Sequence, residues 1–392
     1  MRIGVDATCW LLPRGFGRHV RGLLPALRSI DRSNAYTFFT DSAAAAAELD
    51  SMSAGEARLV KTSTPTLAAA AAGRSRSLSD LLAMSRAMAD CALDLLLFPT
   101  VYTYVPVVSR ARKLLMIHDV TGERYPELTL DSQRARLLWR IKGMLARRQA
   151  HAIATVSEYS RNALVSEFGM NGHSVHVVGE AADPVFRRLE DPRATGRLVA
   201  LGLTETRRRI VYLGGFSPHK NLLMLVNAFG SLASRPDLHD VDLVLVGDYE
   251  RETFFSCYEE VRARVRTLAL DSRVVFTGFL ADPDLVVLLN RATVLALPSL
   301  MEGFGLPAVE AAACGCPVIA TTESPLPQLL GNAGLYIDPR RPGELLDALH
   351  TVLVSPERRE HMGRAGVDAA ARLTWDGAAR DLLRVIERTA VL

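Results

Sequence analysis

Residues 302–317 read Glu302-Gly303-Phe304-Gly305-Leu306-Pro307-Ala308-Val309-Glu310-Ala311-Ala312-Ala313-Cys314-Gly315-Cys316-Pro317, and they decide how the second half of the chain folds. Proline is favoured at the start of a helix, and glycine followed by proline is typical of a helix end. With the apolar runs 294–297 and 318–321 on either side, the stretch predicts a strand, a glycine loop, a short helix and a strand. The start of such a helix favours an anion, and a carboxylate on each side of it can bind hydroxyl groups.

Short apolar runs recur on both sides of this stretch and alternate with helix-like segments. Runs of consecutive apolar residues fit strands buried on both faces, and the alternation predicts parallel sheets covered by helices. The expected strands are 3–5, 36–39, 95–98, 114–117, 152–156 and 175–178, then 210–213, 243–246, 274–276, 294–297, 318–321 and 335–337. We also expect helices at Arg18–Arg28, Ala43–Ala47 and Arg134–Arg148, and a loop from Lys61 to Ser79.

The polar segment 183–209 separates two such series. It predicts an α/β protein with two Rossmann-like, doubly wound domains, 1–185 and 186–372, which face a cleft. The segment 373–392 has the pattern of an amphipathic helix, with Leu382, Leu383, Val385 and Ile386 on its apolar face. Ligands of open α/β sheets bind beyond the carboxyl ends of strands, where this chain carries glycines.

Composition restricts the class of protein. The chain has 392 residues, a net charge of +3 and five scattered cysteines. The small net charge gives no argument for nucleic-acid binding, and the odd number of cysteines favours a reducing compartment over a disulfide framework. No apolar run approaches the roughly 20 residues of a membrane-spanning helix. We therefore expect a cytoplasmic protein, at most peripheral at the inner face of the membrane.

The sequence resembles the retaining glycosyltransferases of family 4. The resemblance is carried by the Glu302–Glu310 stretch and by further motifs: Tyr212-Leu213-Gly214-Gly215, Pro218-His219-Lys220-Asn221, Leu245-Val246-Gly247, Phe276-Thr277-Gly278-Phe279, Gly15-Phe16-Gly17-Arg18 and Ile117-His118-Asp119. It implies the GT-B fold, with the final helix crossing back to the N-terminal domain. The branch it resembles most is the mannosyltransferase-like one of polysaccharide biosynthesis.

The resemblance also implies the substrates. The C-terminal domain is expected to bind a nucleotide-diphosphate sugar, GDP-mannose first and a UDP-sugar next, and the N-terminal domain a saccharide or lipid-linked acceptor. No further cofactor is implied. The reaction implied is hexosyl transfer with retention of anomeric configuration.

The same resemblance assigns roles to single residues. It implies that Glu302 and the loop Gly303, Phe304, Gly305 and Leu306 hold the donor sugar, and that Glu310 holds the ribose hydroxyls. Lys220 would neutralise the diphosphate, and His118 would line the cleft beside the transferred sugar. The remaining donor-binding positions are Gly15, Gly17, Gly215, Gly278 and Phe279. Plainer readings stay open: helix-start glutamates, a solvated lysine, a structural histidine and an ordinary glycine turn.

One part of the expected phosphate-binding set is missing. Many family members carry an arginine shortly before the lysine, where this chain has Gly215 or Phe216. His219 or Arg18 are the two candidates to replace that positive charge. The Gly15-x-Gly17 pair lacks the third glycine of a dinucleotide fingerprint, which argues against NAD.

Metal-ligand patterns are weak. Asp282-Pro283-Asp284 and Asp240-Val241-Asp242 match Asp-x-Asp, but we expect the first to start a helix and the second to precede a strand. Neither Cys314/Cys316 nor His173/His176 has nearby partners for a zinc site. The sequence therefore predicts no essential metal.

Three alternatives stay open. The helix Arg134–Arg148 is basic and amphipathic, so it can lie on anionic lipid or be an ordinary solvated helix. A nucleotide-sugar epimerase shares the GT-B architecture. A non-catalytic scaffold could retain the fold, although the presence of Glu302, Glu310 and Lys220 argues against that.

Overall fold

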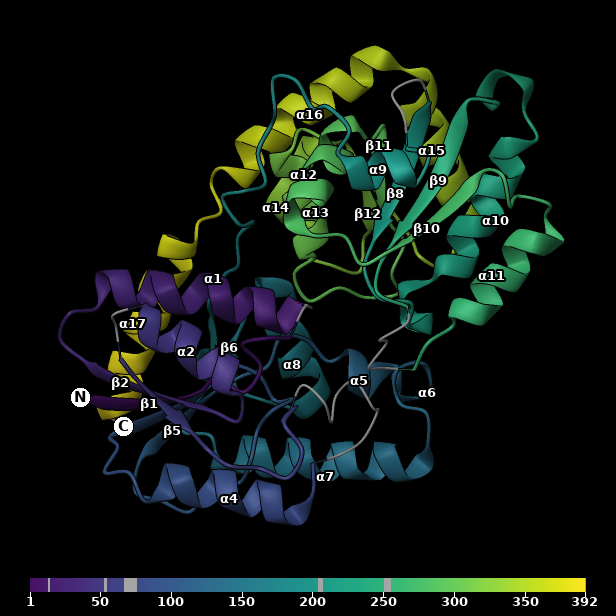
Figure 1. The fold of residues 1–392 in the computed structure, drawn as a ribbon. Helices are drawn as coiled ribbons and strands as arrows, with labels where there is room; N and C mark the ends of the chain where they lie inside the picture. The colour runs from purple at the N-terminus through teal and green to yellow at the C-terminus, as the bar shows by residue number, and fades with distance from the viewer. Residues whose placement is uncertain (13–14, 53–54, 67–75, 204–206, 250–254, 392) are drawn as a thin grey trace. The chain divides into compact units, whose positions relative to one another are not determined.

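The computed structural model describes residues 1–12, 15–52, 55–66, 76–203, 207–249 and 255–391 (Figure 1). The chain divides into two compact units. Unit 1 consists of Met1–Arg124, Asp131–Glu180 and Thr374–Leu392, and unit 2 of Tyr125–Leu130 and Ala181–Leu373.

Unit 1 is built on a seven-stranded parallel sheet with the order β3-β2-β1-β4-β5-β6-β7. In the register, Ile3 lies opposite Tyr36 on one side and Leu95 on the other. The strands are β1 Arg2–Asp6, β2 Ala35–Thr40, β3 Glu56–Leu59, β4 Leu95–Phe98, β5 Arg112–Met116, β6 Ala152–Thr155 and β7 Val175–Val177.

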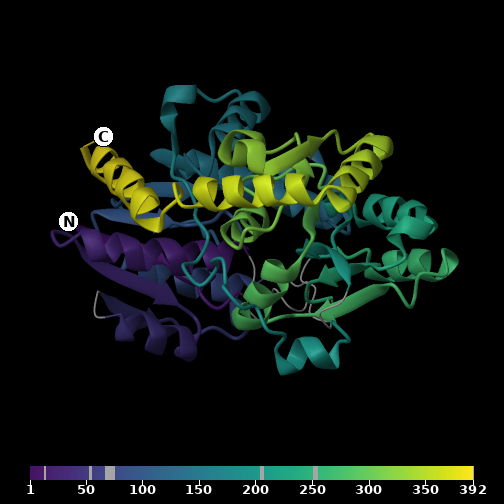
Figure 2. The ribbon, with the colours of Figure 1, turned by 90° about the horizontal axis from the view of Figure 1, so that it is seen from above.

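Helices cover both faces of this sheet. The first and last helices, α1 and α17, lie side by side over one face, and α4 and α7 lie over the other (Figure 1 and Figure 2). The core between the sheet and α1 is aliphatic, with Val5, Leu23 and Leu382 among its fully buried members. The helices are α1 Gly15–Ile30, α2 Ala43–Ser51, α4 Leu78–Ala89, α5 Thr121–Arg124, α7 Gln133–Gln149, α8 Glu158–Phe168 and α17 Trp375–Val391, with a 3₁₀ turn Gly172–Ser174.

Unit 2 is built on a six-stranded parallel sheet with the order β10-β9-β8-β11-β12-β13. Its strands are β8 Arg208–Leu213, β9 Val241–Val246, β10 Val274–Gly278, β11 Val294–Leu297, β12 Val318–Thr321 and β13 Gly334–Ile337. Consecutive apolar residues bury the central strands on both faces, as β9, β11 and β12 show along their whole length.

The helices of unit 2 connect these strands. They are α6 Pro126–Thr129, α9 Gly196–Ala200, α10 Leu222–Ala233, α11 Tyr258–Thr267, α12 Asp282–Arg291, α13 Leu306–Ala313, α14 Leu326–Leu330, α15 Pro342–Val354 and α16 Pro356–Ala370, with 3₁₀ turns at Pro218–Lys220, Pro236–Leu238 and Gly331–Ala333. Helix α16 packs closely on α13, since a Cβ on Gly366 would lie 3.2 Å from the carbonyl oxygen of Ala312.

The predicted two-sheet α/β fold is confirmed, and every predicted strand lies within a few residues of an observed one. The prediction that the final helix returns to the N-terminal half is also confirmed, since α17 belongs to unit 1. Strand β3 was missed because it is short and largely exposed, so it lacks an apolar run. Part of the predicted loop 61–79, namely residues 67–75, lies outside the described residues.

Candidate functional site

The basic residue Lys220 and the carboxylate Glu302 are brought into contact in unit 2. Lys220 Nζ donates a hydrogen bond of 2.8 Å to Glu302 Oε1, and Ser299 Oγ donates one of 2.6 Å to the same oxygen. The side chains of the lysine and the glutamate are 23% and 13% exposed. This partial burial disfavours the reading of Lys220 as a solvated lysine.

The main chain holds these two residues in place. Lys220 ends a 3₁₀ turn that precedes α10, rather than opening that helix itself. The amide of Leu300 donates to the carbonyl oxygen of His219 at 2.8 Å, which ties the loop after β11 to the loop after β8. Glu302 is anchored from the other side, because its amide donates to the carbonyl oxygen of Glu323 at 3.0 Å.

Helix α13 begins as the sequence predicts. Gly305 is its N-cap in the left-handed region, with φ of 87°, and Pro307 lies in the first turn. Gly303, Phe304 and Leu306 are buried around this start. Because the first turn contains no acidic residue and Glu310 lies beyond it, only 3% exposed, the reading of Glu310 as a helix-start residue is wrong.

Glycines at the strand ends of unit 2 allow close main-chain approach. A Cβ on Gly247, after β9, would lie 2.0 Å from the carbonyl oxygen of Gly214, after β8. Gly215 is next in the chain, and its carbonyl oxygen accepts a hydrogen bond of 2.5 Å from Tyr212 Oη. Gly278 ends β10 with φ of 70°, and Phe279 after it is 55% exposed. An exposed aromatic ring at a strand end is available to a ligand.

In unit 1 the segment from Gly15 to Gly17 begins a helix whose start contacts His118 through Phe16. Gly17 lies in the first turn of α1, where a Cβ would lie 1.9 Å from the carbonyl oxygen of Leu12, so no larger residue fits. Gly15, two residues earlier, is exposed. Phe16, between them, packs edge-on against the His118 ring with centroids 5.1 Å apart. The start of α1 and the residue after β5 therefore meet at one place.

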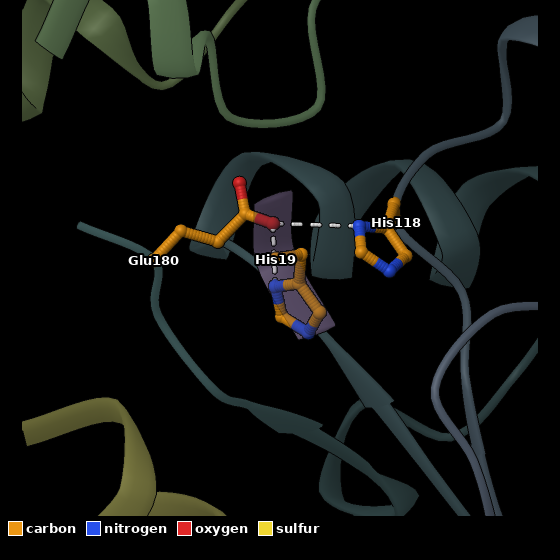
Figure 3. A group of neighbouring side chains, drawn as sticks. All are labelled: His19, His118 and Glu180. Atoms are coloured by element: carbon orange, nitrogen blue, oxygen red, sulfur yellow. Dashed lines mark ion pairs between the residues drawn. The ribbon is translucent and has the colours of Figure 1, made fainter. Parts of the chain in front are cut away.

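His118 belongs to a buried group that the sequence did not reveal (Figure 3). Its Nδ1 lies 3.5 Å from Glu180 Oε1, and His19 Nδ1 lies 2.7 Å from the same oxygen. By hydrogen-bond geometry, neither Nδ1 nor Nε2 of His19 has a partner among the described residues. His118 Nε2 is 2.9 Å from the carbonyl oxygen of Pro99.

The three groups shift one another's protonation. Burial alone would raise the pKa of Glu180, but the two facing imidazoles lower it to about 2. Burial lowers the pKa of His118, but the hydrogen bond and charge of Glu180 outweigh it, and the pKa is raised. For His19, burial dominates and the pKa is lowered.

Sequence reasoning missed His19, Glu180 and Ser299. Two of them had a signal: His19 interrupts the apolar face of a helix, and Glu180 comes two residues after the predicted strand 175–178. Ser299 had none, since a serine in a loop is unremarkable.

One candidate for the missing positive charge, His219, is partly buried. Burial, and after it the charge of Lys220, lowers the pKa of His219 to about 3, so this histidine is neutral at pH 7. This disfavours His219 as the replacement for the arginine. Both His219 and Arg18 stay predictions.

The metal patterns of the sequence have other roles. Asp240 pairs with Arg208, and Asp242 accepts from Arg207 Nε at 2.6 Å. Asp242 lies inside β9 rather than before it. Asp282 and Asp284 lie in the first turn of α12. Burial raises the pKa of Cys314 to about 12, so it is a thiol and a poor metal ligand.

One group among the described residues could present ligands to a metal ion. His19, His118 and Glu180 each offer one ligand atom, and these atoms lie within 4.8 Å of one another. Two imidazoles and a carboxylate form a set that zinc uses in catalytic sites. The contact of 2.7 Å between His19 and Glu180 is shorter than the spacing of about 3.3–3.4 Å that ligands at 2.0–2.1 Å from a tetrahedral zinc would take. That the protein needs no metal stays a prediction.

No helix among the described residues is both long enough and apolar enough to cross a membrane.

Comparison with known proteins finds similarity to glycosyltransferases. Residues 207–355 match the family model "Glycosyl transferases group 1". The D-inositol 3-phosphate glycosyltransferase of Jonesia denitrificans is 31% identical over 62% of this chain and 58% of its own length. The MMP alpha-(1->4)-mannosyltransferase of Mycolicibacterium hassiacum is 28% identical over 62% of this chain and 55% of its own. The matches thus span little more than half the length of these curated relatives.

The fold has full-length counterparts. HepE from Anabaena, solved in complex with UDP-glucose, superposes with a TM-score of 0.75 at 18% identity, over 99% of this chain and 100% of that one. At that identity the likeness concerns the fold alone. The family match thus concerns the segment 207–355, which is similar to group 1 glycosyltransferases, and the full-length superposition together with the two parallel sheets shows that the chain has the GT-B fold.

Proposed function

We propose that the protein is a retaining glycosyltransferase that moves a hexosyl group from a nucleotide-diphosphate sugar to a saccharide or lipid-linked acceptor in polysaccharide or glycoconjugate biosynthesis. The observation that carries the proposal is the contact of Lys220 with Glu302 directly before α13, in the region that matches the family.

The chemistry of transfer explains why these groups belong together. The bond between the sugar and the diphosphate breaks, so negative charge grows on the leaving phosphate oxygen. Lys220 and the start of α13 supply positive charge to stabilise it. Glu302 is then released from Lys220 to accept hydrogen bonds from sugar hydroxyls, and Glu310 takes the ribose hydroxyls. Charged hydrogen bonds of this kind contribute about 1.5–3 kcal/mol each.

Retention of configuration sets the path of the proton. The acceptor oxygen attacks the anomeric carbon from the side of the departing diphosphate, and the hydroxyl proton passes to the leaving phosphate oxygen. One C–O bond forms as another breaks, and no enzymatic base is required. The remaining donor contacts are Gly15, Gly17, Gly215, Gly278 and Phe279.

For the donor we propose GDP-mannose first and a UDP-sugar second. The mannose proposal is supported by the names of two relatives, the mannosyltransferase above and the mannosylfructose-phosphate synthase of Agrobacterium fabrum, 25% identical over 61% of this chain. A thermal-shift series with GDP-, UDP- and ADP-sugars tests it, because a ligand that binds only the folded state raises Tm. Stabilisation by a UDP-sugar alone would contradict the mannose proposal.

The catalytic assignment is tested by Glu302→Gln, with Glu357→Gln as control because Glu357 is an exposed glutamate of the same unit. We expect Glu302→Gln to lower kcat about 10²–10³-fold, the usual loss for a preorganised polar group at a reacting centre. Glu357→Gln should leave transfer unchanged. Undiminished transfer by Glu302→Gln would remove the assignment, and a wild-type protein that binds no sugar nucleotide would remove the proposal.

The two rival functions predict other products. An epimerase would isomerise the sugar nucleotide without an acceptor, which chromatography of the nucleotide pool detects. A scaffold would bind without turnover.

We also propose that α7 makes peripheral contact with an anionic membrane. It presents exposed apolar side chains, Leu137, Leu138, Ile141, Met144 and Leu145, together with several arginines. Basic residues near an anionic surface contribute about 1 kcal/mol each. The protein should sediment with phosphatidylglycerol vesicles at low salt, and Leu138→Ser/Ile141→Ser should weaken this without lowering Tm. Equal sedimentation of both proteins would exclude α7 as the contact.

A further inference from the structure

His118 is held between two hydrogen-bond acceptors. Its Nε2 lies 2.9 Å from the carbonyl oxygen of Pro99, and a carbonyl oxygen can only accept. Its Nδ1 lies 3.5 Å from a carboxylate oxygen of Glu180. A neutral imidazole carries one proton and would turn a lone pair toward one of these two oxygens. Only the doubly protonated ring suits both neighbours.

The charges around the ring balance. Glu180 is the acceptor shared by the two histidines, at a place where its side chain is 4% exposed. His19 Nδ1 lies 2.7 Å from it, and the fully buried Nε2 has no hydrogen-bond partner among the described residues, which suits a neutral ring. One carboxylate and one imidazolium therefore cancel, whereas two imidazoliums would leave a net charge buried.

Few other charged groups face His118. From α1 it meets His19 and the ring of Phe16, from the segment after β7 it meets Glu180, and from its own loop Asp119 adds a negative charge. Asp119 also accepts a hydrogen bond of 2.8 Å from the amide of Thr121. Both acidic neighbours favour the charged ring.

We propose that Glu180 is a positioning residue that holds His118 as an imidazolium with both nitrogens engaged, so that His118 contributes orientation and positive charge, and takes no proton from the acceptor. The catalytic half of this inference rests on the proposed glycosyl transfer. The protonation half concerns the protein alone. A general base needs an unprotonated nitrogen, and in this arrangement His118 offers none.

The protonation half is tested by long-range ¹H–¹⁵N NMR of the imidazoles, with His118→Gln to assign the signals. At pH 7 we expect both nitrogens of His118 to be protonated and only one of His19. In Glu180→Gln, which keeps the shape but loses the charge, His118 should lose its proton about one pH unit or more lower. Glu158→Gln, an exposed glutamate of the same unit, is the control.

Three outcomes would overturn the inference. His118 could be neutral in the wild type at pH 7, or it could titrate identically in Glu180→Gln and the wild type. Stoichiometric Zn²⁺ could displace protons from both rings, which would make the group a metal site. If Glu180→Gln does not fold, Glu180→Asp takes its place. Aspartate keeps the charge but is one methylene shorter, so His118 should lose its proton at a lower pH than in the wild type.

The catalytic half has its own readout. If His118 acts as a charge, kcat falls as pH rises through the pKa of His118, and Glu180→Gln moves that fall to lower pH. If His118 is the base, kcat rises over the same range, and the inference is overturned. Wild-type protein without transfer activity would contradict the proposed function. The NMR experiment would still test the protonation of His118, because it does not depend on transfer.

Discussion

A substitution at Gly305 tests the effect of backbone strain, and the same substitution at Gly343 tests the effect of helix propensity. At Gly305, φ is 87°, in the left-handed region, and a Cβ would lie 2.8 Å from Leu326 Cδ1. We expect Gly305→Ala to lower the free energy of unfolding of unit 2 by about 1–3 kcal/mol. Gly343→Ala, in α15 with open space around it, should instead raise it by about 0.4–1 kcal/mol. Urea unfolding measures both, and equal effects would show that the strain at Gly305 is unimportant.

At this scale the sequence predicted what depends on neighbours along the chain. Gly305 and Pro307 indicate the start of the helix. The sequence also predicts that Glu302 lies just before this start, as the structure shows. The group His19–Glu180–His118 could not be predicted, because it assembles residues from α1, from after β7 and from after β5. Their meeting depends on the order of strands in the sheet, which local patterns do not encode.

Among the elements, the pair α1 and α17 depends on one glycine. A Cβ on Gly22 of α1 would lie 2.2 Å from Cε2 of Trp375 at the start of α17. Alanine favours a helix over glycine by about 0.8–1 kcal/mol, but overpacking costs about 1–3 kcal/mol. We therefore expect Gly22→Ala to lower the Tm of unit 1. The measurement is a double-mutant cycle with Trp375→Ala, in which the penalty should disappear; a penalty that persists would place the strain elsewhere.

Element type followed from periodicity where the apolar face was long. Helices α7 and α17 were predicted with bounds close to the observed ones. Periodicity did not predict β3, because its residues are largely exposed and form no apolar pattern. It also did not predict α9, which lies in the segment interpreted as a polar linker. Both are short, and their formation depends on the elements beside them.

For the whole molecule, the last helix stabilises the unit built by the first residues. Leu382, Val385 and Ile386 of α17 are buried in the core of unit 1, and each large aliphatic side chain contributes about 1.5–3 kcal/mol. Since a domain is stable by only about 5–15 kcal/mol, removal of Thr374–Leu392 should unfold unit 1 and spare unit 2.

Hydrogen exchange followed by mass spectrometry measures this by region. In the shortened protein, peptides from β1 and β4 should exchange fast, while those from β8 and β9 keep their protection. Arg384→Ala, on the exposed side of α17, is the control and should change neither unit. Unchanged protection of β1 would show that unit 1 is stable without α17.

The return of α17 to unit 1 has a consequence for the order of events during synthesis on the ribosome. Apart from Tyr125–Leu130, unit 2 is one continuous segment, and all of it has been translated by residue 373. Unit 1 is translated largely before it, yet its core lacks α17 until the ribosome has passed that residue. Unit 1 is thus translated first, but its core is completed last. Until α17 has been translated, α1 exposes the apolar surface that α17 later covers. Nascent chains paused near residue 373 should therefore be those that chaperones bind most.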